Sequence, residues 1–473
     1  QGRADSYKGT FNMYGGSISG NHVETGSGVG VYVCYGTFNM HGGSITDNTT
    51  KDSYASGGVH VTGGTFNMTG GSITDNSATS SSATGGGVRV DGKGTFNMSG
   101  DAVISNNSGA YSGGGVYVNT ATFNMSGSAS VSGNSADYGG GVYVTNGTAA
   151  AGTFTMSGDA SVSGNSANYG GGVYMRESNS KFTMSENAAV SGNTAKAAGG
   201  GVNLIGGGTF TMGSGSITGN NVIGANLNSS GGGVYVDNGT FNMTGGTISG
   251  NNVTHSDNMH DNEGGGGVYV AENATMNVSG NVQITGNWKN GTLNNGVYEK
   301  GVTGSDNNLY LYAYNSGTPK VLKTVTIDST GLASTAEIGI TTRYTPTASN
   351  PIKIATGATE NLAYYTNIFT PDVTDYTVTK DGTTLYLSAH THVWSYTVSE
   401  NGKTITATCT ANGCNLPNQS GGSVTIVAPD KNTLTYDGNT KEATLEGALT
   451  TGVTLPDIKY YYKIGEQEYQ LET

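Results

Sequence analysis

The sequence predicts an all-β protein: a right-handed parallel β-helix of about ten three-strand coils plus irregular last coils, followed by a small all-β C-terminal module. Two observations lead to this prediction. A repeat of 27 to 35 residues runs through residues 1 to about 300, and each copy carries short segments in which apolar and polar residues alternate. The composition of the 473 residues, with 80 glycines, 7 prolines and 11% charged residues, disfavours both a helical and a disordered chain.

The first segment of each copy is marked by a phenylalanine. It recurs as Phe11, Phe38, Phe66, Phe96, Phe123, Phe154, Phe182, Phe210 and Phe241, and a methionine follows two residues after each. A divergent tenth copy has Met276-Asn277-Val278 in place of the phenylalanine and methionine. Residues two apart on a strand share a face, so both columns are expected inside the β-helix.

Two further segments complete the coil. An isoleucine or valine stands seven or eight residues after each phenylalanine, and a Gly-Val-x-Val segment such as Gly141-Val142-Tyr143-Val144 follows. Strands this short bury a face only when copies stack on one another. Right-handedness follows from the general hand of parallel crossovers. A β-propeller is the less favoured alternative, because its blades need about 40 or more residues.

An asparagine follows the isoleucine or valine by three residues in every copy: Asn21, Asn48, Asn76, Asn107, Asn134, Asn165, Asn193, Asn220, Asn251 and Asn287. Asparagine tolerates tight-turn geometry, and stacked side-chain amides can bond along a ladder. We therefore interpret this row as a structural corner.

The composition divides the chain into three parts. Residues 1–302 hold the regular repeats, and residues 303–389, poorer in glycine, are expected to form irregular terminal coils and a cap. Residues 390–473 are expected to form a small Ig-like β module that is truncated. Because the chain starts within a repeat and stops without an end signal, we expect a fragment of a longer protein.

The first candidate binding surface is the row of x residues in Gly-Val-x-Val. The row comprises Tyr32, His60, Arg89, Tyr117, Tyr143, Tyr174, Asn203, Tyr235, Tyr269 and Tyr298. These side chains point away from the valine face, which predicts an exposed stripe of tyrosines. One interpretation is ring stacking that stiffens the sheet. The other is an aromatic platform for sugars or a partner protein, with Tyr117, Tyr143, Tyr174, Tyr235 and Tyr269 as binding residues.

The second candidate is an insert in the longest copy, with His255, Asp257, His260, Asp261 and Glu263 within nine residues. Loops on a rigid scaffold often carry function. The insert is interpreted as a solvated polar loop, with metal ligation or a carboxylate pair for glycoside chemistry as alternatives.

The third candidate lies in the tail. His390, His392, Cys409 and Cys414 are a chemically sensible set of tetrahedral Zn²⁺ ligands. A disulfide between the two cysteines, or free thiols, are the alternatives. Zinc or a disulfide here would have a structural role, because a small module has little core of its own.

Two stretches resemble known families. The stretch from Val131 to Tyr143, with its Val-x-x-Asn and Gly-Gly-Gly-Val segments, resembles the repeats of polymorphic outer-membrane proteins and related adhesin-like surface proteins, although Ile or Val stands here where those families have Phe. The tail is similar to large surface proteins of gut Gram-positive bacteria, through His390, His392, Trp394, Cys409, Cys414, Tyr436, Asp437 and Gly438. These resemblances imply a secreted cell-surface protein of a gut commensal with an adhesive or scaffolding role.

Composition and motifs restrict the function. The net charge of −13 disfavours nucleic acid as a partner, and no apolar run is long enough to span a membrane. No nucleophile elbow, phosphate loop or zinc-protease motif occurs, so no catalytic residue is assigned. We expect a secreted, extracellular or cell-wall-attached adhesin or scaffold that binds glycan or a host surface protein. The alternatives are a polysaccharide-active enzyme, either a glycoside hydrolase or a lyase, and a passive structural stalk.

Overall fold

The computed structural model describes residues 8–26, 29–147, 151–224, 230–254, 264–294, 297–301, 304–312, 323–357, 364–400, 403–411, 420–427, 444–449, 453, 461–464 and 467–470. The chain forms two compact units. The first comprises residues 1–373 and 378–388, and the second comprises residues 374–377 and 389–473. No helix among the described residues is long and apolar enough to cross a membrane.

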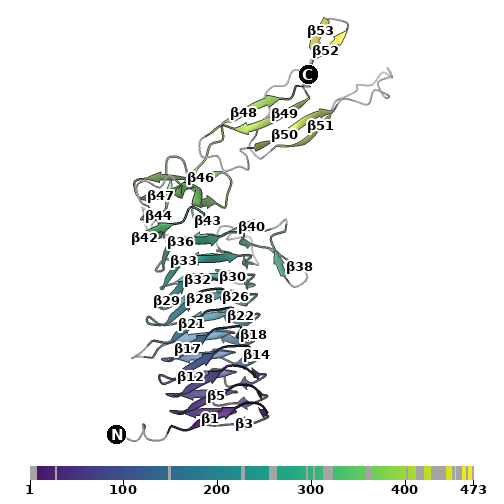
Figure 1. The fold of residues 1–473 in the computed structure, drawn as a ribbon. Helices are drawn as coiled ribbons and strands as arrows, with labels where there is room; N and C mark the ends of the chain where they lie inside the picture. The colour runs from purple at the N-terminus through teal and green to yellow at the C-terminus, as the bar shows by residue number, and fades with distance from the viewer. Residues whose placement is uncertain are drawn as a thin grey trace, which may run out of the picture. The chain divides into compact units, whose positions relative to one another are not determined.

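The first unit is a parallel β-solenoid of about 11 turns, as the sequence predicts (Figure 1). The phenylalanine segments form the strands β1 (Thr10–Met13), β5 (Thr37–Met40), β9 (Thr65–Met68), β13 (Thr95–Met98), β17 (Thr122–Met125), β21 (Thr153–Met156), β25 (Lys181–Met184) and β29 (Thr209–Met212). The isoleucine or valine segments form β2 (Ser17–Ser19), β6 (Ser44–Thr46), β10 (Ser72–Thr74), β14 (Val103–Ser105), β18 (Ser130–Ser132), β22 (Ser161–Ser163), β26 (Ala189–Ser191) and β30 (Ser216–Thr218). In the next two coils these segments merge into β33 (Thr240–Ser249) and β36 (Thr275–Ile284).

The Gly-Val-x-Val segments from Val31 to Val270 form a third set of parallel strands, which Leu309–Leu311 completes. These are β4 (Val31–Cys34), β8 (Val59–Thr62), β12 (Val88–Asp91), β16 (Val116–Asn119), β20 (Val142–Thr145), β24 (Val173–Met175), β28 (Val202–Ile205), β32 (Val234–Asp237), β35 (Val268–Val270) and β41 (Leu309–Leu311).

The structure adds a fourth short strand directly after each of the ten predicted asparagines, and an eleventh strand of this kind lies just before Asn307. These strands form a separate eleven-stranded sheet, which we call the corner sheet. Its members are β3 (His22–Val23), β7 (Thr49–Thr50), β11 (Ser77–Ala78), β15 (Ser108–Gly109), β19 (Ser135–Tyr138), β23 (Ser166–Tyr169), β27 (Thr194–Ala198), β31 (Asn221–Val222), β34 (Asn252–Val253), β37 (Trp288–Lys289) and β40 (Ser305–Asp306).

The core is a set of continuous side-chain columns. Equivalent residues pair across neighbouring strands, as in Phe123 with Phe154 and Met125 with Met156. The phenylalanine rings from Phe38 to Phe241 are at most 1% exposed, and successive rings stack with centroids 4.6 to 4.9 Å apart. Phe11, in the first coil, stacks on Phe38 at 5.1 Å and is 49% exposed. The predicted inward column is therefore confirmed. The glycines before the third set of strands let neighbouring coils approach closely. A Cβ on Gly141 would lie only 2.7 Å from the Gly172 carbonyl oxygen.

The last coils are less regular. They contain β42 (Val325–Leu332), β43 (Glu337–Thr342), β44 (Ile352–Thr356), α1 (Tyr365–Ile368), β45 (Phe369–Pro371), β46 (Tyr376–Asp381) and β47 (Thr384–Ala389). Strand β47 pairs antiparallel with β44, which ends the parallel stacking there. A small hairpin, β38 (Thr292–Asn294) and β39 (Val297–Glu299), leaves the solenoid just before β40.

The second unit contains an antiparallel sheet, which agrees with the small all-β module that the sequence predicts. Its order is β48 (Trp394–Val398), β49 (Thr404–Cys409), β50 (Ser420–Val427) and β51 (Thr444–Leu449). A further hairpin consists of β52 (Tyr461–Ile464) and β53 (Gln467–Gln470). The buried hydrophobic side chains described in this unit are Ile405, Ala407, Cys409 and Val424.

Candidate functional site

The asparagine row is a hydrogen-bonded ladder, which supports its interpretation as a structural corner. The backbone N–H and the Nδ2 of Asn134 both donate to Oδ1 of Asn165, at 2.9 and 3.0 Å, and Asn165 repeats the pattern toward Asn193. The ladder runs beyond the ten predicted members to Asn308, and Asn308 donates to Asp372. Each member from Asn48 to Asn287 is 1% exposed or less, so this row offers no binding surface.

The tyrosine row is not the exposed stripe that the sequence predicts. Tyr143, Tyr174 and Tyr269 are only 4 to 8% exposed, and Tyr117 and Tyr235 are half-buried. The rings do stack, with centroids 5.2 Å apart for Tyr143 and Tyr174. Burial raises the pKa of the Tyr143, Tyr174 and Tyr235 hydroxyls above their usual value. These side chains stiffen the sheet, and the three most buried have almost no ring surface to offer a ligand.

The last member of the tyrosine row is also corrected. Tyr298 lies in β39, opposite Leu293, and the residue that pairs with Tyr269 is Tyr310 of β41. The Tyr310 ring is fully buried and stacks on Tyr269 at 5.3 Å. The hairpin between β37 and β40 lengthens this turn, so spacing along the sequence pointed to the wrong tyrosine.

A second tyrosine row, which the sequence analysis did not single out, packs over part of the first. Tyr138 ends β19 and Tyr169 ends β23, and their rings stack at 5.4 Å. The Tyr138 ring also contacts Tyr174 edge-on at 5.2 Å and Tyr111 at 5.2 Å. Tyr169 is 38% exposed, so the accessible aromatic surface in this region includes this second row. A tyrosine directly before Gly-Gly-Gly was the available sequence signal.

The break in the first row at His60 and Arg89 is a buried charge cluster. The Asp91 carboxylate lies 3.1 Å from His60 Nε2 and 2.8 Å from Arg89 Nε, and it also accepts a hydrogen bond from Thr62. Burial raises the pKa of Asp91, but the hydrogen bonds and charges of His60 and Arg89 outweigh this effect and hold the pKa well below its usual range. The guanidinium also lies over the Tyr117 ring, at 5.2 Å. The charged groups of this cluster pair with one another, and their contacts join three successive coils.

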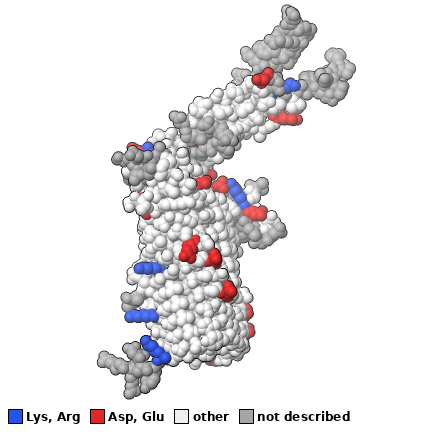
Figure 2. All heavy atoms as spheres, viewed as in Figure 1, with Lys and Arg blue, Asp and Glu red and all other residues white. Residues whose placement is uncertain are grey.

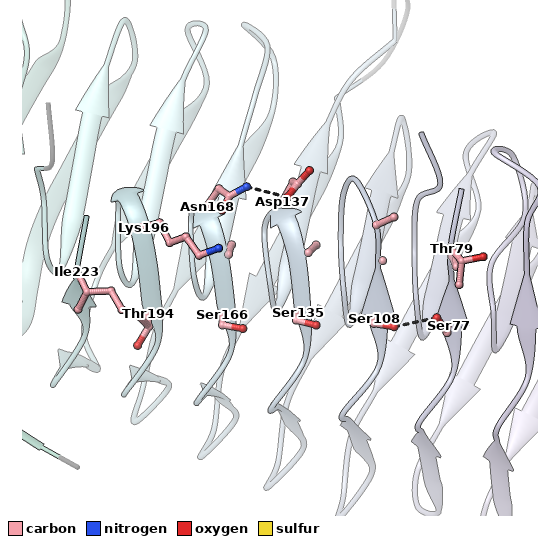
Figure 3. A pocket seen from close by; sticks show the side chains of 15 residues that line it. Ser77, Thr79, Ser108, Ser135, Asp137, Ser166, Asn168, Thr194, Lys196 and Ile223 are labelled. Atoms are coloured by element: carbon pink, nitrogen blue, oxygen red, sulfur yellow. Dashed lines mark hydrogen bonds between the residues drawn. The ribbon is translucent and has the colours of Figure 1, made fainter. Parts of the chain in front are cut away.

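One accessible concave surface in the described part of the chain is a groove across the corner sheet. It has a volume of about 570 Å³ and crosses six consecutive strands, from β11 to the end of β31. Figure 3 shows one hydroxyl side chain per strand in a row along it: Ser77, Ser108, Ser135, Ser166 and Thr194. At a strand spacing of about 4.8 Å, the row extends for about 19 Å. The shape and the repeated hydroxyls suit an extended polymer that runs along the solenoid axis.

The residues beside the hydroxyls of the groove are small. The residues that follow the five hydroxyl residues are Ala78, Gly109, Ala136, Ala167 and Ala195. The next strand has Val222 at this position, and the 44% exposed Ile223 bounds the groove there. The signal for this site, a repeated Ser/Thr-Ala/Gly after the asparagine, is present in the sequence, but only the asparagine led to an interpretation, as a structural corner.

Polar and aromatic groups border the groove. Asn168 Nδ2 donates to Asp137 Oδ1 at 2.7 Å, and the Lys196 side chain lies on the neighbouring strand (Figure 3). Tyr138 and Tyr169 directly follow Asp137 and Asn168 along the chain. On the face of the solenoid that Figure 2 shows, charged side chains are few and separated by wide uncharged areas. The groove therefore offers hydroxyl and amide groups, with tyrosine rings at its border and little net charge.

The other predicted site residues divide into two groups. His255, Asp257, His260, Asp261 and Glu263 lie outside the described residues, as do Cys414, Tyr436, Asp437 and Gly438. His390, His392 and Cys409 are described, and their ligand atoms all lie within 4.8 Å of one another. Among the described residues this is the one group of three or more His, Cys, Asp or Glu side chains that converge in this way.

No family model, curated protein or solved structure matches this chain. What the protein does must therefore be argued from its surfaces.

Proposed function

We propose that this protein is a secreted, cell-surface binding rod of the adhesin type that holds a neutral glycan chain along the groove of the corner sheet. The observation that carries the proposal is the row of five hydroxyl side chains on consecutive strands, with the stacked Tyr138 and Tyr169 at the ends of two of them. The resemblance of residues 131–143 to adhesin-like repeats supports the same class of function.

A neutral glycan suits this surface better than a peptide or a nucleic acid. Hydroxyl and amide side chains exchange hydrogen bonds with sugar hydroxyls, and an exposed tyrosine ring packs against the apolar face of a sugar. A peptide that adds to a sheet needs a free strand edge, whereas the groove lies across the face of the corner sheet. The groove residues include one carboxylate and one ammonium group, Asp137 and Lys196, so neither charge sign dominates.

The same residues favour binding over hydrolysis. Glycoside hydrolysis ordinarily uses two carboxyl groups about 5 to 10 Å apart across the scissile bond. Asp137 is the single carboxylate among the residues that line the groove, and it is engaged by Asn168.

The test is a binding assay on immobilised mucin and on neutral glucans, mannans and xylans. The unmodified chain should bind at least one neutral polysaccharide, and the double variant Ser135→Leu, Ser166→Leu should bind it more than about 10-fold less well, which corresponds to about 1.4 kcal/mol. Both serines are exposed, so the fold tolerates the change. Ser161→Leu, on the outer side of β22, is the matched control and should leave binding unchanged.

Three outcomes would contradict the proposal. Equal binding by the double variant and by the control would show that the groove is not the glycan-binding site. Failure of the unmodified chain to bind any of these glycans would favour the passive stalk. Release of new reducing ends from the bound polysaccharide would instead favour the enzyme.

A further inference from the structure

The second unit carries a cluster of metal-ligating side chains that the proposed glycan groove does not use. His390 and His392 precede β48, and Cys409 is the last residue of β49. Trp394 pairs with Cys409 across the two antiparallel strands, which places both side chains on one face of the sheet. Positions 390 and 392 precede 394 by steps of two residues, so an extended chain brings both histidines to that same face.

The backbone holds this end of the hairpin in place. Thr410 N donates to the Val393 carbonyl at 2.8 Å, so the strand pairing continues one step beyond Trp394 and Cys409. His390 N donates to the Asp375 carbonyl at 2.7 Å, which fixes the start of the segment within the same unit. The histidine rings are positioned too, since His392 stacks on Trp394 at 4.9 Å.

The two distances from the cysteine sulfur to the histidine nitrogens are close to those of a tetrahedral metal site. Cys409 Sγ lies 3.3 Å from His392 Nδ1 and 3.8 Å from His390 Nε2. With metal–nitrogen bonds of about 2.05 Å and a metal–sulfur bond of about 2.3 Å, tetrahedral angles give an N···S separation of about 3.6 Å. The two N···S separations lie on either side of this value. The two histidine nitrogens lie within 4.8 Å of each other, against about 3.3 Å between two nitrogen ligands of a tetrahedral ion, so one ion would draw the two rings together.

From this geometry we propose that His390, His392 and Cys409 form a Zn²⁺ site that stabilises the second unit. Thiolate and imidazole ligands together select Zn²⁺ over Mg²⁺ or Ca²⁺, which prefer oxygen. On binding, the Cys409 thiol loses its proton to solvent and its sulfur forms the metal bond, while each histidine contributes the lone pair of a neutral ring nitrogen. Three protein ligands leave a fourth position on the ion.

The surroundings indicate a structural role for the metal. Cys409 is fully buried, and the two histidines are half-buried. The described hydrophobic core of this unit consists of Cys409 and three other side chains, which is little for an independent module. Because the ligands are brought together by folding, the free energy of metal binding adds directly to the stability of the sheet.

The test is a titration of the full-length, reduced chain with Co²⁺, in a Cys34→Ser background that removes an exposed thiol of the solenoid. One equivalent of Co²⁺ should produce a thiolate-to-cobalt charge-transfer band, and Zn²⁺ should displace it. His392→Ala and His390→Ala should each weaken the affinity more than about 100-fold, because loss of an outer-shell partner alone already costs about 10–100-fold. His41→Ala, which removes an exposed histidine of the solenoid, is the matched control and should leave the titration unchanged.

Alkylation supplies a second measurement that does not require a Cys409 variant to fold. Zn²⁺ should slow the reaction of Cys409 with iodoacetamide, read by mass spectrometry of its peptide, and His392→Ala should abolish this protection. Absence of the charge-transfer band, or protection that does not depend on His392, would overturn the proposal. A Cys409 that reacts only after reduction in the freshly purified chain, which contains no bound zinc, would identify a disulfide instead.

Discussion

Asp372 terminates the asparagine ladder, and its burial leads to a prediction about pH. Its carboxylate oxygens accept hydrogen bonds from Asn308 Nδ2 at 2.6 Å, from Asn308 N at 2.9 Å and from Thr341 Oγ1 at 2.6 Å. Burial nevertheless raises the pKa of Asp372 from 3.8 to about 6. The folded chain therefore keeps a proton that the unfolded chain releases, and the free energy of unfolding falls as the pH rises from about 4 to about 6. A shift of about two units corresponds to a loss on the order of 3 kcal/mol.

The assay is urea unfolding between pH 4 and pH 7, followed by Trp288 fluorescence in a Trp394→Phe background so that only the solenoid is observed. Asp372→Asn should remove the fall in stability across this window, because an amide continues the ladder without a charge. Asp159→Asn, at an exposed carboxylate that also bonds an asparagine, is the matched control and should retain the fall. If Asp372→Asn and the unmodified chain show the same pH dependence, the reasoning from burial is refuted.

Four further substitutions test the columns and the charge cluster by urea unfolding. Phe154→Ala removes a ring stacked between two others and should lower the free energy of unfolding by about 3–5 kcal/mol, whereas Asn124→Ser on the outer face should lower it by about 1 kcal/mol; similar losses would contradict the assignment of inside and outside. Asn165→Ala leaves two buried donors without an acceptor and should cost about 2–5 kcal/mol; a neutral result would mean that the ladder is dispensable. Asp91→Asn should destabilise the chain by about 3–5 kcal/mol at pH 7, because it uncouples a buried guanidinium. Since the pKa of Asp91 is lowered, the unmodified chain should lose this contribution only as the pH falls below about 3.8, and loss already at pH 6 would argue against the cluster.

The sequence was sufficient for the columns that depend on local repetition. Phenylalanine and methionine stand two residues apart in nine copies, and a strand places such residues on one face, so the inside of the solenoid followed directly. The asparagine ladder could be predicted for the same reason. The Arg89–Asp91 pair was also within reach, because the two residues share one face of β12.

Contacts between distant segments could not be predicted in this way. Strand alternation shows to which side Tyr143 and Tyr174 point, but it does not show that Tyr138 of the corner sheet packs against Tyr174. Asp372 meets Asn308 across 64 residues of irregular sequence, where no repeat gives the register. The groove required knowledge of a fourth strand, and strands of two to five residues are too short for periodicity to reveal them.

The groove is a local property of the sequence and is not required by the solenoid. At the position after the groove hydroxyl, five consecutive coils carry alanine or glycine, whereas Val222 and Val253 fill the same column in the next two coils and are fully buried. Ala195, Val222 and Val253 belong to one buried cluster, so the fold accommodates the larger side chain at this position. A rod that served only as a spacer could carry valine throughout and would bury more apolar surface by doing so. Five consecutive coils instead keep alanine or glycine beside the row of hydroxyls, and this departure from the most stable choice supports the proposed binding groove over a passive stalk.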